Sequence, residues 1–351
     1  MNTKKLIVLW FAIFSIVSFV SCDSLTSALE GPAGEDGVDG EDGEQGPPGE
    51  IEEGENDENV WTSDLTVQSK EDLYFLRDNQ IVEVEGDLIF RDFRITDDEG
   101  YLILTNVPVR EIGGSLEFRR LMIGGEGDAA AKSTDRNTPN AQRVDVFKNI
   151  NIETVGNDVR FRDIVWAIDE DAFSSETFQS PLFRLSELEF VGGTFRARDN
   201  YGVDDTEALI SMPELREVQN RLLLNDVILS GSLKFSNLEK VGNDIHLHLS
   251  DDTEDIHFPE LVEVGGYQFL IAGIGGSTSI SFDSLLEVPG LFSIYDNDSL
   301  EEIDFPDLSR VGGTFSITEN PELPTSNAED LRDQVEDRDG IGGTVTIEDN
   351  K

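Results

Sequence analysis

A segment of about 23 residues recurs in the C-terminal part of this chain, and its length limits the folds that the chain can adopt. The two clearest copies share six residues at a constant offset: Phe282, Leu285, Val288, Phe292, Ile294 and Asn297 recur as Phe305, Leu308, Val311, Phe315, Ile317 and Asn320. A unit this short cannot bury its own apolar face. Stacked units bury it against one another, so the repeat predicts a solenoid.

Most copies carry a Val-x-Gly mark followed by alternating apolar and polar residues, which is the pattern of a strand with one buried face. We call the Val or Ile of each mark the corner residue. The ten corner residues are Val84, Ile112, Val155, Val191, Val218, Val241, Val264, Val288, Val311 and Ile341. Their spacing is even from Val218 to Val311 and wider before it, which predicts surface loops at 124–143, 166–181 and 200–210.

Two short helices are expected to cap the ends of the solenoid, because an open end exposes core residues. Ser69 is the predicted N-cap of the first helix, with Glu71 and Asp72 in the first turn, where the helix dipole favours acids. The second helix is predicted after Thr325 and Ser326, with a hydroxyl group as its cap.

These motifs resemble leucine-rich-repeat-like L domains. The resemblance rests on the VGGxFxIxxN repeats, the FPxLxxV segments ahead of Val264 and Val311, and the helices that open and close the repeat region. It covers about residues 60–351. It implies an all-β, right-handed parallel β-solenoid, as found in animal receptors, fungal cell-wall proteins and bacterial surface lipoproteins, and recognition of extracellular partners without catalysis.

The N-terminus predicts a secreted, lipid-anchored protein. Lys4 and Lys5 precede a short apolar run, as in a secretory signal, and residues 19–22 (FVSC) resemble a bacterial lipobox. Residues 1–21 are therefore interpreted as a signal peptide and Cys22, the single cysteine, as the lipidated residue. A plain secretory signal with an incidental cysteine is the alternative.

Residues 22–59 are interpreted as an acidic, disordered spacer ahead of a single domain at 60–351. Glycine stands at every third position from Gly31 to Gly49, as in collagen. The segment is short, poor in proline and acidic without lysine partners, so we favour an extended spacer over trimerisation through residues 31–50.

The net charge of the chain argues against one class of partner, nucleic acids. The chain has 73 Asp and Glu against 26 Lys and Arg, a formal charge of −47. Such a chain repels nucleic acid. Together with the predicted anchor, the charge favours a bacterial cell envelope location, at the outer membrane or cell surface, attached through the N-terminal lipid.

The alternation predicts which side chains face outward. Counted from each corner residue, the fourth and sixth residues face the core, as in Phe292, Ile294, Val345 and Ile347, and the third, fifth and seventh face solvent. The predicted outward residues, turn by turn, are Asp87, Ile89 and Arg91; Ser115, Glu117 and Arg119; Asp158, Arg160 and Arg162; Thr194, Arg196 and Arg198; Arg221, Leu223 and Asn225; Asp244, His246 and His248; Tyr267, Phe269 and Ile271; Leu291, Ser293 and Tyr295; and Thr314, Ser316 and Thr318.

This face combines a cluster of arginines with an apolar patch, which is unexpected in so acidic a chain. The candidate binding residues are Arg91, Arg119, Arg160, Arg162, Arg196, Arg198, Arg221, His246, His248, Tyr267, Phe269 and Tyr295. Arginine binds carboxylate or sulfate groups, and aromatic rings bind sugars or protein partners, so we expect an extracellular glycan or protein ligand. The alternative is that the arginines pair with neighbouring acids.

Two other function classes stay open. A secreted β-helix enzyme that degrades polysaccharides would need paired carboxylates, whereas Asp87, Glu117 and Asp158 come singly beside arginines and are interpreted as ion-pair partners. A purely structural envelope protein is the second alternative. No catalytic residue and no cofactor are predicted.

Metal binding is not favoured. His246 and His248 are too few for a zinc site, and the acidic groups at Asp204 and Asp296 lack EF-hand spacing, although Ca²⁺ stays an open alternative there. Asn297, Asn320 and Asn350 follow successive strands and predict a ladder of stacked turns that bond to the backbone.

Overall fold

The computed structural model describes residues 59–92, 94–95, 107–123, 150–166, 183–201, 208–228, 231–249 and 253–351. They belong to one compact unit, Glu53–Lys351. The predicted signal peptide, Cys22, the spacer and its collagen-like segment lie outside the described residues, as do the predicted loop at 124–143 and the central parts of the other two predicted loops. Neither helix in the described ranges is long and apolar enough to cross a membrane.

The described residues form a parallel β-solenoid built from three sheets, as the repeat predicted. In the first sheet every strand is two residues long and ends at a corner residue or, in β1, at Trp61. Its strands, in spatial order, are β1 (Val60–Trp61), β3 (Glu83–Val84), β6 (Glu111–Ile112), β9 (Thr154–Val155), β13 (Phe190–Val191), β16 (Glu217–Val218), β19 (Lys240–Val241), β22 (Glu263–Val264), β25 (Glu287–Val288), β28 (Arg310–Val311) and β30 (Gly340–Ile341).

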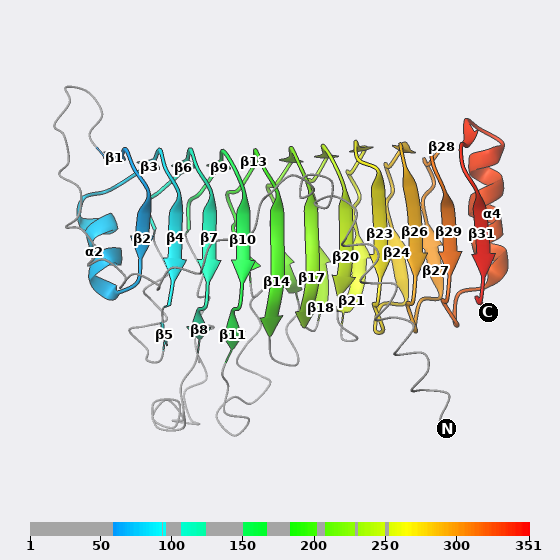
Figure 1. The fold of residues 1–351 in the computed structure, drawn as a ribbon, viewed down its shortest axis with the longest axis horizontal. Helices are drawn as coiled ribbons and strands as arrows, with labels where there is room; N and C mark the ends of the chain where they lie inside the picture. The colour runs from blue at the N-terminus through cyan, green and yellow to red at the C-terminus, as the bar shows by residue number, and fades with distance from the viewer. Residues whose placement is uncertain are drawn as a thin grey trace, which may run out of the picture. The chain divides into compact units, whose positions relative to one another are not determined.

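The second sheet contains the longer strands that were predicted after each corner, and Figure 1 shows them side by side from β2 to β31. Its main strands are β2 (Leu65–Val67), β4 (Leu88–Arg91), β7 (Leu116–Arg119), β10 (Val159–Arg162), β14 (Phe195–Tyr201), β17 (Leu222–Ile228), β20 (Ile245–Leu249), β23 (Gln268–Ala272), β26 (Leu291–Tyr295), β29 (Phe315–Thr318) and β31 (Val345–Glu348). Three short strands, β5 (Arg94–Ile95), β8 (Met122–Ile123) and β11 (Val165–Trp166), lie beyond the ends of β4, β7 and β10; they pair with one another, and β11 pairs with β14 (Figure 1).

The third sheet closes each turn, and it is described only in the later part of the chain. Its strands are β12 (Phe183–Arg184), β15 (Ala208–Ser211), β18 (Gly231–Lys234), β21 (Thr253–His257), β24 (Ser279–Ser281) and β27 (Glu302–Asp304). We call each set of consecutive strands that makes one turn a rung.

Stacked phenylalanines form the centre of the core. Phe90 stacks on Phe118, and Phe118 on Phe161, with ring centroids 5.0 Å apart in both pairs. Phe292 and Phe315 repeat this arrangement at 5.2 Å and are fully buried, which confirms that the fourth residue after a corner faces inward. In-register parallel pairing sets this contact, because it places the same repeat position of each rung directly above the last.

Glycine is favoured at most corners because successive rungs touch there through their backbones. A Cβ atom at Gly192, the residue after Val191, would overlap the carbonyl oxygen of Gly156 in the preceding rung. This contact explains the glycine of that rung, whereas Glu85, Gln219 and Pro289 stand at the same position in other rungs.

The two helices lie at the two ends of the described solenoid, α2 (Lys70–Asp78) beside β2 and α4 (Thr325–Glu336) beside β31 (Figure 1). Ser69 is the N-cap of α2, and its Oγ accepts a hydrogen bond from the Asp72 amide, as predicted. The predicted hydroxyl cap of α4 is wrong. Pro324 occupies the N-cap position without a side-chain bond, and the Thr325 hydroxyl instead donates to the Lys351 carbonyl.

The expectation that the last strand buries its inward side chains is also wrong. Val345 is 39% exposed, and Ile347 is only partly buried against the core. In the described structure no further rung follows β31, so the inward residues of this strand are covered on one side only.

The asparagine ladder is confirmed. Asn297 and Asn320 are fully buried, and the Asn297 Nδ2 donates to the Asn320 Oδ1 at 2.9 Å. The Asn320 Nδ2 donates in turn to the Asn350 Oδ1 at 3.1 Å. Each asparagine follows a residue with positive φ, such as Glu319 at 58°, which turns the chain out of the second sheet. The asparagine side chains of the ladder bond the backbone groups that this tight turn leaves without backbone partners.

An arginine-lined face of the second sheet

The predicted alternation of inward and outward side chains is confirmed along most of the second sheet, but one rung is wrong. Outside that rung, five of the predicted outward residues are nevertheless buried: Ser115, Thr194, Leu223, Asp244 and Ser293. In the rung that is wrong, the two faces are exchanged. Phe269 and Ile271 are fully buried, and Leu270 occupies the outward position between them. Phe269 pairs in register with Phe292, although it is the fifth residue after its corner and not the fourth. The extra residue is Tyr267, which is 81% exposed at the turn. Aligning Phe269 with Phe292 by residue type would have revealed the shift.

The predicted aromatic patch is not formed. Phe269 belongs to the core, and Leu223 is only 8% exposed. Tyr267 lies at the start of the strands, where its carbonyl accepts a hydrogen bond from the Leu291 amide, whereas Tyr295 ends β26. The two tyrosines are therefore about five residues apart along the strands, on the order of 17 Å.

The predicted arginine cluster does come together. Strands β4, β7, β10 and β14 place Arg91, Arg119, Arg162 and Arg198 at paired positions, so these four residues form one column across the strands. Two residues earlier on β10 and β14, Arg160 pairs with Arg196 and starts a second, shorter column. Like charges at directly opposed positions of a sheet repel one another, so this arrangement costs stability.

A shallow hollow of about 280 Å³ lies over β10 and β14. Four arginines and one acid line it together with Phe161: Glu117, Arg160, Arg162, Arg196 and Arg198. Its charged lining therefore has four positive groups against one negative group. In a chain with a net charge of −47, this is a local reversal of sign that suits an anionic group.

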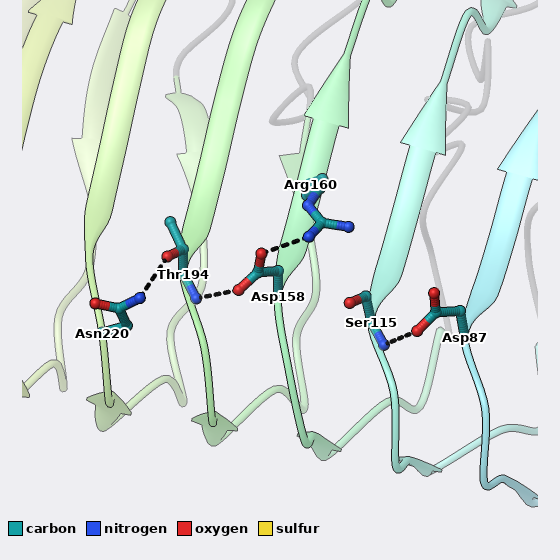
Figure 2. A network of polar contacts seen from close by, with 6 residues as sticks. All are labelled: Asp87, Ser115, Asp158, Arg160, Thr194 and Asn220. Atoms are coloured by element: carbon teal, nitrogen blue, oxygen red, sulfur yellow. Dashed lines mark hydrogen bonds and ion pairs between the residues drawn. The ribbon is translucent and has the colours of Figure 1, made fainter. Parts of the chain in front are cut away.

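Aspartates at the corners hold both the strands and some of the arginines in place. Figure 2 shows Asp158 using its Oδ1 to accept from the Thr194 amide, at 2.6 Å, and its Oδ2 to accept from Arg160 Nη2, also at 2.6 Å. Three rungs further along the sheet, Asp244 accepts from the Gln268 amide at 3.0 Å and pairs with Nε of Arg221, from the preceding rung, at 3.0 Å. These carboxylates lie beneath the glycines of the next rung, where a Cβ at Gly193 would overlap Asp158 Oδ1.

The alternative interpretation, that the arginines pair with neighbouring acids, holds for several of them. Arg160 pairs with Asp158, Arg221 with Asp244, and Arg162 Nε with Asp163 Oδ2 at 3.2 Å. Asp87, predicted as an ion-pair partner, instead accepts from the Ser115 amide at 2.6 Å (Figure 2). The predicted role is therefore confirmed for Asp158 and wrong for Asp87.

Arg196 differs from these arginines because its rung has Thr194 at the corner position where β10 has Asp158. The Thr194 hydroxyl accepts from the Asn220 side chain at 3.1 Å, as Figure 2 shows, and offers Arg196 no charge. Within the described residues, Arg196 forms no ion pair. Burial lowers the pKa of its guanidinium, and Arg160, Arg198 and Arg221 lower this pKa further, against the opposite effect of Asp158. Arg196 thus lies among like charges, which a bound anion would relieve.

The two predicted histidines lie next to the arginines on β20 but have different surroundings. His246 pairs with Leu223 on one side and Leu270 on the other, and burial lowers the pKa of its imidazole. His248 is exposed, and its ring lies over Gly273. No group of three or more metal-binding side chains occurs among the residues that the structure describes. Asp204 lies outside them, and Asn297 beside Asp296 is used in the asparagine ladder.

No protein family, curated protein or solved structure matches this chain. The function of the protein is therefore inferred from the residues of the second sheet.

Proposed function

We propose that this protein is a noncatalytic binding protein of the bacterial cell envelope, and that the hollow on its second sheet binds an anionic extracellular partner. One observation supports this above all others. Arg196 lies in a hollow lined by three further arginines and has no ion-pair partner among the described residues. A guanidinium in this position offers its planar fork to a carboxylate or a sulfate group.

The energetic cost of the arrangement supports binding over a purely structural role. The pairing of Arg160 with Arg196 and of Arg162 with Arg198 places like charges on adjacent strands. Asp158 and Asp163 offset part of this repulsion, but their ion pairs are partly exposed and individually weak. A structural sheet would be more stable with neutral residues at these positions, as β26 and β29 have with Ser293 and Ser316.

The acids near the hollow support binding over turnover. Glycoside hydrolysis uses two carboxyl groups on either side of the bond that is cleaved. Glu117 is the single acid among the residues that line the hollow. The nearby Asp158 uses both of its oxygens, one for the Thr194 amide and one for Arg160.

The predicted N-terminal features complete the proposal. A lipid on Cys22 would attach the protein to the membrane, and the acidic spacer 22–59 would hold the solenoid away from the anionic surface. In this proposal the chain is a surface lipoprotein of the L-domain type, and its second sheet faces an extracellular glycan or protein. Protease treatment of intact cells tests the location, because a surface protein is removed and a periplasmic one is protected.

Charge reversal at Arg196 tests the binding site. The purified protein and the variant Arg196→Glu are compared on an array of acidic and neutral glycans and acidic proteins. Arg310→Glu is the matched control, because Arg310 is an exposed arginine that pairs with Glu287 on the first sheet, far from the hollow in sequence and on a different sheet. We expect Arg196→Glu to abolish binding of the anionic ligand and Arg310→Glu to leave it unchanged.

Two outcomes would contradict the proposal. Equal binding by the wild type and Arg196→Glu would show that the hollow is not the site. New reducing ends or unsaturated sugars after incubation with acidic polysaccharides would show an enzyme, and the noncatalytic interpretation would then be wrong.

A further inference from the structure

The arginines of the second sheet form a line that is longer than the hollow. The column Arg91, Arg119, Arg162 and Arg198 crosses four successive strands in register. Adjacent strands lie about 4.8 Å apart, so the four Cα positions span about 14 Å along the solenoid axis. The hollow uses the last two of these arginines, and Arg91 and Arg119 continue the line beyond it.

The two outer arginines are not neutralised by close ion pairs within the described structure. The Nε atom of Arg119 is buried without a hydrogen-bond partner. Arg91 lies against the side-chain amide of Gln68, which is neutral. Asp92, an acid at this end of the strands, forms its close ion pair with Arg120, at 2.6 Å, and interacts with Arg91 and Arg119 at longer range. A compact anion in the hollow would leave this half of the column unused.

We propose that the ligand is a linear acidic glycan that runs along the solenoid axis, across the strands, and presents one anionic group to each rung from β4 to β14. This inference rests on the proposed function and specifies its ligand. The column then binds successive carboxylate or sulfate groups of one chain. Arg160 and Arg196 contact the same chain at the hollow, where the two columns lie side by side.

The spacing of the rungs favours a glycan over an acidic peptide. Side chains on one face of an extended peptide recur at about 6.7 Å, twice the rise per residue, and fall out of step with rungs about 4.8 Å apart. One pyranose unit lengthens a glycan by roughly one rung, so a bound glycan that turns its anionic groups to one side stays in step with the strands. Past Arg198 the column continues with Asn225 and the exposed His248, whose polar groups suit sugar hydroxyls.

A series of ligand lengths tests this geometry. Oligogalacturonates carry one carboxylate on each sugar, so the affinity of the purified protein for the di-, tetra- and octasaccharide can be compared by titration calorimetry. We expect the affinity to rise about tenfold or more from the disaccharide to the tetrasaccharide, because the added carboxylates bind at high effective concentration. It should then level off, since four rungs have an arginine in this column.

Variants at the two ends of the site separate this inference from the proposed function. Arg119→Gln should lower the ratio of tetrasaccharide to disaccharide affinity, whereas Arg196→Gln should weaken both ligands. Arg310→Gln, on the first sheet, should change neither. Increasing salt should weaken the tetrasaccharide more steeply than the disaccharide, because more ion pairs are broken.

Three results would overturn the inference. Equal affinity for the disaccharide and the tetrasaccharide, with loss of both in Arg196→Gln, would leave the proposed function standing and show a compact-anion site. Tighter binding of oligoglutamate than of the glycan at equal charge would assign an acidic protein as partner. No binding of any of these anions would refute the proposed function itself.

Discussion

Replacing Asn320 by alanine should destabilise the solenoid strongly. Asn320 is fully buried in the middle of the asparagine ladder. Its Oδ1 accepts from the amide and the side chain of Asn297, at 3.3 and 2.9 Å. Its Nδ2 lies within bonding distance of the Thr318 carbonyl at 2.9 Å, the Asn350 Oδ1 at 3.1 Å and the Ile294 carbonyl at 3.2 Å.

The size of the effect follows from the number of bonds that are lost. The amide nitrogen has two hydrogens, so about four of these contacts count as full hydrogen bonds. Each contributes about 1 kcal/mol, and alanine leaves the former partners buried without replacements. We expect a loss of about 4 kcal/mol in the free energy of unfolding. The last member, Asn350, is only partly buried and should lose about 1 kcal/mol when replaced by alanine, since water reaches its partners.

Urea unfolding followed by circular dichroism measures these differences. The double variant Asn297→Ala, Asn320→Ala should lose less than the sum of the two single variants, because both singles break the same Asn297–Asn320 bond. A loss below about 1 kcal/mol for Asn320→Ala, or the same loss at Asn350, would show that the ladder does not hold the turns together.

Three further predictions follow from other positions. Burial lowers the folded-state pKa of His246, so as pH falls below about 6.5 the unfolded chain takes up a proton that the folded chain resists, and stability falls. His246→Gln should therefore make the free energy of unfolding, measured in urea between pH 7.5 and pH 5, less dependent on pH than in the wild type, by no more than about 1.4 kcal/mol per pH unit, and an unchanged slope would refute this. Glu319 has a φ of 58°, so Glu319→Gly should stabilise the protein by about 0.5–1 kcal/mol in urea unfolding, whereas Thr318→Gly, in a strand, should destabilise it. Gly193→Ala should cost about 2–3 kcal/mol because its Cβ overlaps Asp158 Oδ1 and the backbone of Asn157; a change below 0.5 kcal/mol, measured by thermal unfolding, would contradict the steric account of the corner.

Much of the candidate site could be predicted because the second sheet is in register. Once the repeat positions are known, parallel pairing puts Arg160 beside Arg196 and Arg162 beside Arg198, and the structure confirms both pairs. The prediction from repeat positions fails where one rung has an extra residue. Tyr267 shifts β23 by one position, and because strand side chains alternate, the shift exchanged the inward and outward faces for Phe269 and Leu270.

The sequence by itself determined the periodic part of this protein. This part comprises the repeat length of the solenoid, its glycine corners, its phenylalanine core and its asparagine ladder. These features follow from short-range steric and hydrophobic patterns that recur in each repeat. Only the tertiary structure decided which arginines are neutralised. Asp158 reaches the next rung and Arg160 at once, whereas Thr194 leaves Arg196 without an acid, and such contacts depend on the three-dimensional positions of side chains from different rungs.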